Sequence, residues 1–179
     1  MMKGLFLSLA ALTLVASSAE AQRSSGRGST PIELGIDGGV IFGLDNPKVS
    51  VVSLPLQDFR IGFLVSPRWE IEPRFNLTSV HGGGFSATDY SLELGALYQP
   101  AGDRVGKGLY ARPFLGLAGT TVSGGGSDHN GFGGFGLGVK LPFNDRRLAT
   151  RMEAAYSHTF GNGGANAIGI LFGLSFFTR

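Results

Sequence analysis

The sequence contains no cysteine, which excludes disulfide bonds and thiolate metal sites in this chain. Charged residues are scarce, at 16% of the 179 residues, and the formal net charge is only +2. No block of Lys or Arg stands out, so the electrostatic footprint of a nucleic-acid partner is missing and we expect no such partner. Beyond the N-terminus, no run is both long and apolar enough to predict a membrane-spanning helix.

The N-terminus, MMKGLFLSLAALTLVASSAEAQ, has the three parts of a secretory signal peptide. Lys3 precedes an apolar stretch over 5–16, and the small residues Ala19 and Ala21 flank Glu20. The alternative, an uncleaved anchor helix, is disfavoured because the apolar stretch is too short to span a bilayer comfortably. The pattern therefore predicts a cleaved signal peptide at 1–21, a flexible polar leader at 22–30 and export from the cytoplasm.

Glycine is abundant, with 30 residues, and much of it lies in segments where large apolar residues occupy every second position. This period of two is typical of β-strands, whose successive side chains point to opposite faces. Pro55 cannot donate to a strand ladder, so we expect a bulge or a frayed end there. The alternation predicts eight strands, near 32–42, 49–65, 69–78, 89–98, 109–117, 134–141, 148–157 and 168–176.

The predicted strands are joined mostly by connections of two kinds. Short turns (SPR, NDR) alternate with Gly-rich segments (HGGGFSA, SGGGSDHNG, GNGGAN) that we expect to be longer loops at the opposite end. No helical pattern of useful length follows the signal peptide. The fold class is therefore predicted to be all-β, an eight-stranded antiparallel up-and-down transmembrane β-barrel over residues 31–179.

The two faces of the predicted strands differ in chemistry. A water-facing surface needs abundant Lys and Glu, whereas the second face here is mostly Gly and Ser with single charges. This favours a barrel whose apolar face meets lipid and whose second face lines a narrow lumen. Because buried charges must be paired, we expect a structural ion-pair network that fills the lumen. Its predicted members are Glu33, Asp37, Arg60, Glu70, Glu72, Arg74, Glu93, Arg112, Lys140, Arg151 and Glu153.

Aromatic residues near the predicted strand ends are candidates for the girdles that such barrels place at the two membrane interfaces. Those expected on the periplasmic side are Trp69, Tyr98, Phe143 and Phe176, and those expected on the outer side are Phe42, Phe132 and Phe160. In the last strand, AIGILFGLSFFTR, Phe176 has the phase of the apolar row and Phe177 does not. We expect Gly169, Gly173 and Ser175 to be small because they face a crowded lumen.

The signal peptide, the alternating strands, the Gly-rich outer loops and the terminal aromatic together resemble small Gram-negative outer-membrane barrels of the OmpA/OmpX type. The resemblance implies a bacterial outer-membrane location, outer-membrane lipid as surroundings, and a monomer. It also implies that the barrel-assembly machinery reads the last strand, with Phe176 as the assembly-signal aromatic. In the family the aromatic is normally the final residue, whereas here Phe177, Thr178 and Arg179 follow it.

The function that these features predict is non-enzymatic, structural or surface-interactive, acting through outer loops around Gly82, Gly125 and Gly163. The first alternative is a narrow, porin-like channel for small solutes or ions. The second is a lipid A-modifying barrel enzyme, which the resemblance suggests through His158 near the top of the seventh strand. Ser157 is its neighbour, but adjacent strand residues point to opposite faces, which is poor geometry for activating a nucleophile.

The three histidines, His81, His129 and His158, lie in or beside the predicted outer loops, and Asp128 adjoins His129. Loops that converge could build a His/Asp metal site, but no ligand-spacing motif is present. The segments HGGGF and SGGGS precede no helix, so they are not phosphate-binding loops. We therefore expect no catalytic residue, no metal and no cofactor.

Overall fold

The computed structural model describes residues 32–45, 50–82, 85–101, 107–143, 147–161 and 164–178. They belong to the compact unit Pro31–Arg179. The expected signal peptide at 1–21 and leader at 22–30 lie outside the described residues. A search of the described residues for a helix long and apolar enough to span a membrane finds none.

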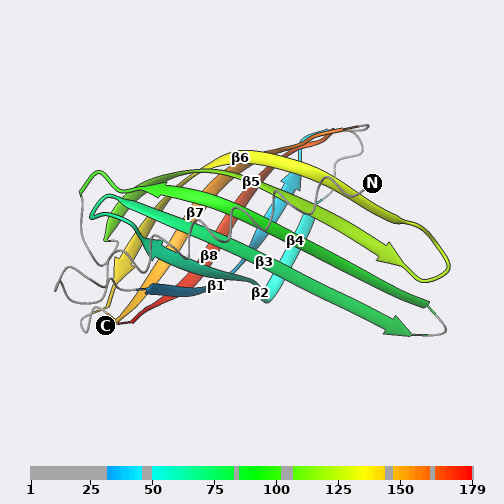
Figure 1. The fold of residues 1–179 in the computed structure, drawn as a ribbon, viewed down its shortest axis with the longest axis horizontal. Helices are drawn as coiled ribbons and strands as arrows, with labels where there is room; N and C mark the ends of the chain where they lie inside the picture. Colours follow the sequence, from blue (N-terminus) through cyan, green and yellow to red (C-terminus); the bar gives the residue numbers. More distant parts are fainter. Residues whose placement is uncertain are drawn as a thin grey trace. The chain divides into compact units, whose positions relative to one another are not determined.

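The described chain is an all-β, closed antiparallel barrel in which each strand pairs with its sequence neighbours and β1 pairs with β8 (Figure 1). The predicted eight-stranded barrel is thereby confirmed. All regular elements of the described residues are strands. They are β1 (Ile32–Gly43), β2 (Ser50–Leu64), β3 (Trp69–Gly82), β4 (Phe85–Tyr98), β5 (Gly108–Val122), β6 (Ser127–Pro142), β7 (Leu148–Thr159) and β8 (Asn166–Phe177).

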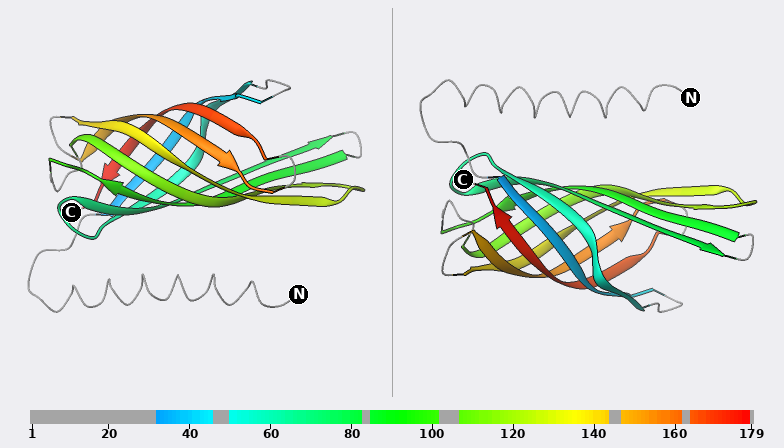
Figure 2. Two further views of the ribbon diagram at one scale, coloured as in Figure 1. Left: turned by 90° about the horizontal axis from the view of Figure 1, so that it is seen from above. Right: turned by 90° about the horizontal axis from the view of Figure 1, so that it is seen from below.

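The two ends of the barrel differ. At one end, which we call the turn end, β2 joins β3 through a tight turn in which Trp69 N donates to Ser66 O at 3.3 Å. At the other, the hairpin end, the β3–β4 and β5–β6 hairpins extend farthest (Figure 2). Two of the Gly-rich segments predicted as loops are mostly strand there, since β3 runs to Gly82 and β6 begins at Ser127. Backbone pairing with the neighbouring strand needs no side chain, so glycine does not end these strands.

The contact between β2 and β3 is the shortest ladder of the barrel. It comprises five residue pairs, from Asp58↔Asn76 to Leu64↔Glu70, whereas the other ladders comprise ten to fourteen. The ladder is interrupted opposite Pro73, which has no N–H to donate. Beyond Asn76, β2 follows β1 and β3 follows β4, so the two hairpins diverge toward the hairpin end (Figure 1).

The irregularity expected at Pro55 is confirmed. The β1–β2 register jumps between Asp37↔Asp58 and Gly39↔Ser53, so residues 54–57 of β2 are left over against a single residue of β1. This bulge is where β2 leaves β3, because the last β2–β3 pair includes Asp58. The shift in register and the opening beside β3 therefore have one origin, the LPLQ segment of β2.

The residue after the last strand extends the β1–β8 ladder that closes the barrel. Thr178 N donates to Ile32 O at 2.9 Å, and Ile32 N donates to the Thr178 hydroxyl at the same distance. Phe177 N donates to Arg147 O at 2.8 Å. Thr178 thus extends the β1–β8 contact at the turn end, which gives this part of the C-terminal tail a structural role. Arg179 lies outside the described residues.

The side-chain distribution is the reverse of that of a water-soluble protein. Large apolar residues on every strand are exposed on the outer face, for example Leu109 at 71% and Leu115 at 66%. Phe176 is 47% exposed while Phe177 is buried, as the phase of the last strand predicts. One girdle assignment is wrong, because Phe132 points inward and contacts the Phe114 ring at 6.3 Å between centroids. Phe132 is two and four residues before Gly134 and Gly136 on β6, so its side chain points to the same, inward face.

Candidate functional site

The barrel interior holds the candidate site, since charged side chains gather there. All eleven residues that the alternation directs inward lie in this interior, ten of them buried and Glu93 with 13% of its side chain exposed. We call these eleven residues and Tyr110, which joins them, the lumen network. Seven of the eight strands contribute charged or phenolic side chains to it, and β8 contributes the Ser175 hydroxyl as a neighbour.

Lys140 on β6 organises the part nearest the turn end. Its ammonium donates to Glu33 Oε2 at 2.5 Å and to Glu70 Oε2 at 2.8 Å, so it joins β6 to β1 and β3 across the lumen. Gln99, the first residue after β4, donates from Nε2 to the same Glu70 oxygen at 3.5 Å. All four side chains are buried. A strongly hydrated ammonium group can lie here because two carboxylates replace its water.

Arg60 on β2 uses its whole guanidinium group. Its Nε donates to Asp37 Oδ2 at 2.9 Å, its Nη1 donates to Glu33, and its Nη2 donates to the Ser175 hydroxyl at 2.7 Å. These contacts connect β2 to β1 and β8. The planar, five-donor geometry of arginine suits this arrangement, because a lysine could not address three partners on two strands with fixed geometry.

Glu153 on β7 is the centre of the network. It accepts from Arg112 Nη2 at 2.6 Å, from Arg151 Nη2 at 2.5 Å and from Arg74 Nη2 at 3.3 Å. The Tyr110 hydroxyl donates to Glu153 Oε2 at 2.7 Å and accepts from Arg151 Nε at 2.5 Å. The Arg151 guanidinium also lies over the Tyr110 ring, 4.6 Å from its centroid. One carboxylate therefore joins β3, β5 and β7 and compensates three buried cations.

Glu72 and Glu93 also accept hydrogen bonds from these arginines and compensate their positive charge. Arg74 Nε donates to Glu72 Oε1 at 3.0 Å, and Arg151 Nη1 donates to the other Glu72 oxygen. Arg112 Nη1 donates to Glu93 on the adjacent strand. Each arginine of the central cluster thus faces at least two carboxylates. Such a network rigidifies an interior when its members are satisfied, and removal of one member leaves buried charge behind.

The glycines of the inward face make room for these long side chains. A Cβ at Gly136 would lie 2.6 Å from Glu153 Oε1, and a Cβ at Gly95 would lie 2.8 Å from Arg112 Nη1. Gly173 lies against Asp37 in the same way, as the crowding argument expects. The argument is wrong for Gly169, where the nearest atom to a Cβ would be Ile41 Cγ1 at 3.6 Å. Gly169 borders a cavity and not the network.

The network has more acids than bases, with six carboxylates against five cations. Among the described residues, Asp37 Oδ1, Glu70 Oε1 and Gln99 Oε1 are buried oxygens without a hydrogen-bond partner. Carboxylate oxygens of Glu33, Glu70 and Glu72 lie within 4.8 Å of one another, a spacing that could hold a cation. Lys140 already donates to two of these three acids, so its ammonium group supplies the positive charge at this place.

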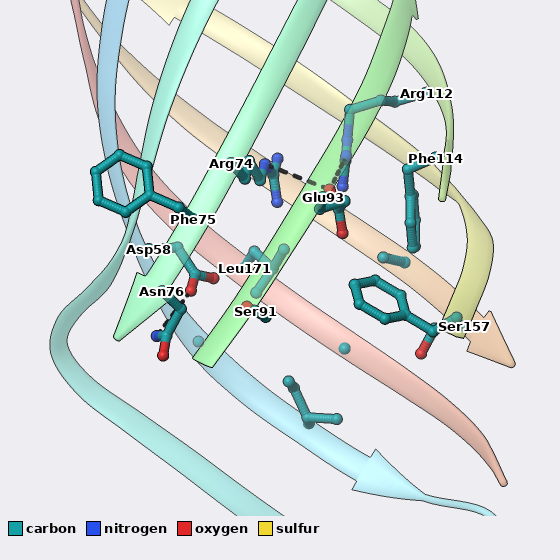
Figure 3. A pocket seen from close by; sticks show the side chains of 15 residues that line it. Asp58, Arg74, Phe75, Asn76, Ser91, Glu93, Arg112, Phe114, Ser157 and Leu171 are labelled. Atoms are coloured by element: carbon teal, nitrogen blue, oxygen red, sulfur yellow. Dashed lines mark hydrogen bonds and ion pairs between the residues drawn. The ribbon is translucent and has the colours of Figure 1, made fainter. Parts of the chain in front are cut away.

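A cavity of about 290 Å³ lies on the hairpin side of the network. Its floor is formed by Arg74, Glu93 and Arg112, and its walls carry Asp58, Asn76, Ser91 and Ser157 together with apolar groups (Figure 3). The apolar lining comprises Ile41, Phe114, Phe132 and Leu171. The lumen is thus filled at the level of the network and hollow above it.

The geometry at the top of β7 does not resemble a nucleophile–base pair. Ser157 points into the cavity, whereas the next residue, His158, contacts Asn166 through Nδ1 at 3.0 Å. The His158 ring also packs on Phe160, 5.4 Å between ring centroids. Among the described residues, no hydrogen bond connects Ser157 to His158. The opposite facing of strand neighbours accounts for this, as the sequence predicts.

The histidines do not converge in the part of the chain that the structure describes. His81 contacts the Ser79 hydroxyl at 2.8 Å on β3, and His129 lies exposed on β6 beside Asp128. None of the three histidines belongs to a group of described residues close enough to share a metal ion. Asp128 instead accepts a long hydrogen bond from Asn130 Nδ2 at 3.4 Å.

Sequence reasoning gave no role in the network to three interior residues of consequence, Tyr110, Gln99 and Asp58. Each has the inward phase of its own strand, since Tyr110 is two residues before Arg112 and Asp58 two residues before Arg60. Gln99 continues the phase of Glu93 and Leu97 just past the end of β4. The signal that could have found them is therefore the same period of two, applied to uncharged residues and to the strand margins.

Comparison with known proteins identifies the fold. No protein-family model matches the sequence, and no curated protein matches it either. Among solved structures, Neisserial surface protein A (NspA) matches with a TM-score of 0.51 and 10% identity over 81% of this chain and 96% of NspA. Ail of Yersinia pestis matches with a TM-score of 0.47 and 12% identity, over 83% of this chain and 99% of Ail. The N-terminal β-barrel domain of Pseudomonas aeruginosa OprF has a TM-score of 0.45 and 16% identity, over 84% of this chain and all 100% of that domain.

These three proteins are small eight-stranded outer-membrane barrels. The closed eight-stranded barrel and its similarity to NspA therefore confirm, at the level of the fold, the resemblance inferred from the sequence. At 10% identity, the similarity to NspA concerns the fold alone and carries no residue role to this chain.

Proposed function

We propose that this chain is a bacterial outer-membrane β-barrel protein without enzymatic activity. It is exported through a signal peptide at 1–21, which is cleaved, and it works as a monomer surrounded by outer-membrane lipid. The observation that carries the proposal is the distribution of side chains. Large apolar residues are exposed on all eight strands, while arginines, lysine and carboxylates are buried inside. This distribution is stable when the outer face meets hydrocarbon, and closure pairs every strand with both of its neighbours, β2 with β3 over the part from Asp58↔Asn76 to Leu64↔Glu70.

The proposed role is structural or surface-interactive, exerted by the hairpin end of the barrel. The β3–β4 and β5–β6 hairpins replace the flexible loops that the sequence predicts around Gly82 and Gly125. They present a paired, projecting surface, and the outer loop expected around Gly163 lies outside the described residues. Strand hairpins lose less conformational freedom on binding than long loops do, which favours a role in surface contacts.

A conducting channel is the less favoured function. The lumen network crosses the barrel between Arg60, Glu153 and Arg112, and its members are held by two or more partners each. An eight-stranded barrel is only wide enough for its side chains to fill. A lipid A-modifying activity is also disfavoured, because Ser157 and His158 face opposite sides of β7.

For assembly, we propose that the barrel-assembly machinery recognises the last strand through Phe176. This ring is exposed at the turn end in line with Ile170, Phe172 and Leu174, whereas Phe177 is buried. Replacement of Phe176 by alanine should lower the amount of barrel in the outer membrane more than the same replacement of the exposed outer-face residue Phe172.

The decisive experiment is fractionation of cells that express the full chain. We expect the mature protein in the outer-membrane fraction, beginning at Gln22, with heat-modifiable migration typical of a folded barrel. Recovery in the soluble fraction would contradict the proposal. In planar bilayers we expect no steady conductance, and a steady conductance that changes in Arg112→Ala or Glu93→Ala would contradict the filled lumen.

A further inference from the structure

We infer that the cavity above the lumen network is a binding site for a small organic cation with an apolar, aromatic body. The inference concerns a site that the proposed function does not use. It rests on the shape of the cavity, on the chemistry of its walls and on the distribution of charge in the interior.

The position of the cavity makes it accessible from the hairpin end. Of the lining residues on β3, Asn76 lies nearer the hairpin end than Arg74. On β4, Ser91 lies nearer that end than Glu93, so Asn76 and Ser91 form the part of the wall toward the hairpin end. The wall between β2 and β3 ends at the pair Asp58↔Asn76, the last of their ladder. A ligand of the size of a substituted benzene fits a space of about 290 Å³.

Asp58 is the carboxylate that would recognise the cation. Its Oδ1 accepts from Asn76 Nδ2 at 3.1 Å, and none of the cationic side chains in the described part of the chain forms an ion pair with it. The nearest arginine on the floor, Arg74, is already paired with Glu72 at 3.0 Å and with Glu153 at 3.3 Å. Asp58 therefore presents a carboxylate to the cavity that the protein does not neutralise by contact.

The charge of the whole interior points the same way. Asp58 adds a seventh carboxylate to the six of the lumen network, against five cations. Around the cavity itself, Asp58 and Glu93 face Arg74 and Arg112, and Glu72 and Glu153 also compensate these two arginines, so the surroundings favour a cation over an anion. An inorganic divalent ion would need several oxygen ligands around it, whereas much of the cavity lining, including Ile41, Phe114, Phe132 and Leu171, is apolar.

The aromatic wall supplies the second part of the recognition. Phe114 and Phe132 meet edge to face, with ring centroids 6.3 Å apart, and both line the cavity. The Arg112 guanidinium already lies over Phe114, 4.5 Å from its centroid, so this wall suits the aromatic body of the ligand, whose charged group lies at Asp58. Aromatic rings pack against one another, and Leu171 and Ile41 give an apolar surface for the remainder of the ligand.

The test uses the full mature barrel, refolded in lipid nanodiscs, and benzylammonium chloride as the probe. Calorimetric titration should detect saturable binding, and benzyl alcohol and sodium benzoate, which have the same ring without the positive charge, should bind at least roughly tenfold more weakly. Asp58→Asn keeps the shape and should weaken benzylammonium binding by roughly tenfold to hundredfold. The matched control is Asp89→Asn, which removes an exposed carboxylate outside the cavity and should leave binding unchanged.

A second variant tests the site without touching a charge. Gly169 lines the cavity and has room for a Cβ, so Gly169→Leu should fill the space and abolish binding while the barrel still folds. Absence of benzylammonium binding to the wild-type barrel would overturn the inference, and so would equal binding of benzoate or unchanged binding in both variants. Equally tight, Asp58-dependent binding of calcium chloride would overturn the assignment of an organic ligand.

Discussion

The Tyr110 hydroxyl donates a hydrogen bond to Glu153 Oε2 at 2.7 Å and accepts one from Arg151 Nε at 2.5 Å. A phenol thus lies between a buried acid and a buried base and satisfies both. The three residues come from β5 and β7, which are not neighbours in the barrel, so the contact passes over the inner face of β6 at Gly138. This relationship explains why a filled lumen can be stable: each charge has a partner that is itself held in place.

Tyr110→Phe should therefore destabilise the barrel without changing its charge. The variant leaves Arg151 Nε and one Glu153 oxygen each with one partner fewer, which we expect to cost about 1–3 kcal/mol in the free energy of unfolding. Urea unfolding of the barrel in lipid vesicles measures this. Tyr98→Phe is the matched control, because Tyr98 lies on the outer face against Trp69, and it should be nearly silent. Equal effects of the two variants would contradict the proposed role of the phenol.

Within the network, the two acids Glu153 and Glu70 should differ in their sensitivity to neutralisation. Glu153→Gln removes the charge that three arginines share, and we expect a cost of about 3–5 kcal/mol. Glu70→Gln should cost less, because the network has one acid in excess and Glu70 Oε1 has no partner among the described residues. The same unfolding measurement compares them. A larger loss for Glu70→Gln than for Glu153→Gln would contradict the hub assigned to Glu153.

The outward facing of the apolar residues can be tested by charge insertion. Leu92 is 59% exposed near the middle of β4, opposite Leu117, and Leu92→Arg should cost about 2–4 kcal/mol in a bilayer. Leu109→Arg, on the outer face at the start of β5, should cost about 0–1 kcal/mol, since the penalty falls toward the membrane interface. Folding yield and unfolding free energy in vesicles check both. If Leu92→Arg is silent, the assignment of this face to lipid fails.

The need for glycine differs along the inward face. A Cβ at Gly138 would lie 2.6 Å from the backbone Met152 O and would also meet the Tyr110 ring, so Gly138→Ala should cost about 1–3 kcal/mol through overpacking. At Gly169 the nearest atom would be 3.6 Å away, which is ordinary contact, and Gly169→Ala should be neutral or slightly stabilising. Urea unfolding midpoints of the two variants measure this difference. A similar loss of stability in both variants would show that crowding is not specific to the network.

Local alternation in the sequence was sufficient to predict the barrel, and the eleven charged residues that it directs inward lie in the interior, whereas Asp58 was not counted among them. A pleated strand directs successive side chains to opposite faces, so the phase of Arg60, Glu72 or Glu153 depends only on its own strand. The phase also separated Phe176 from Phe177. The same rule, applied consistently, would have directed Phe132 inward and added Tyr110 to the network, because both follow the phase of their strands.

Tertiary structure alone decided which charges meet. Arg112 and Glu153 are 41 residues apart in sequence, Arg74 and Glu153 are 79, and Lys140 and Glu33 are 107, and their contacts depend on barrel closure and strand register. The early end of the β2–β3 ladder, the length of the Gly-rich hairpins and the cavity beside Asp58 also follow from pairing between strands. Period and composition are properties of single strands, so the sequence determined which face of each strand points inward. Register and enclosed space are properties of all eight strands together, so only the fold determined which charges meet and where the cavity lies.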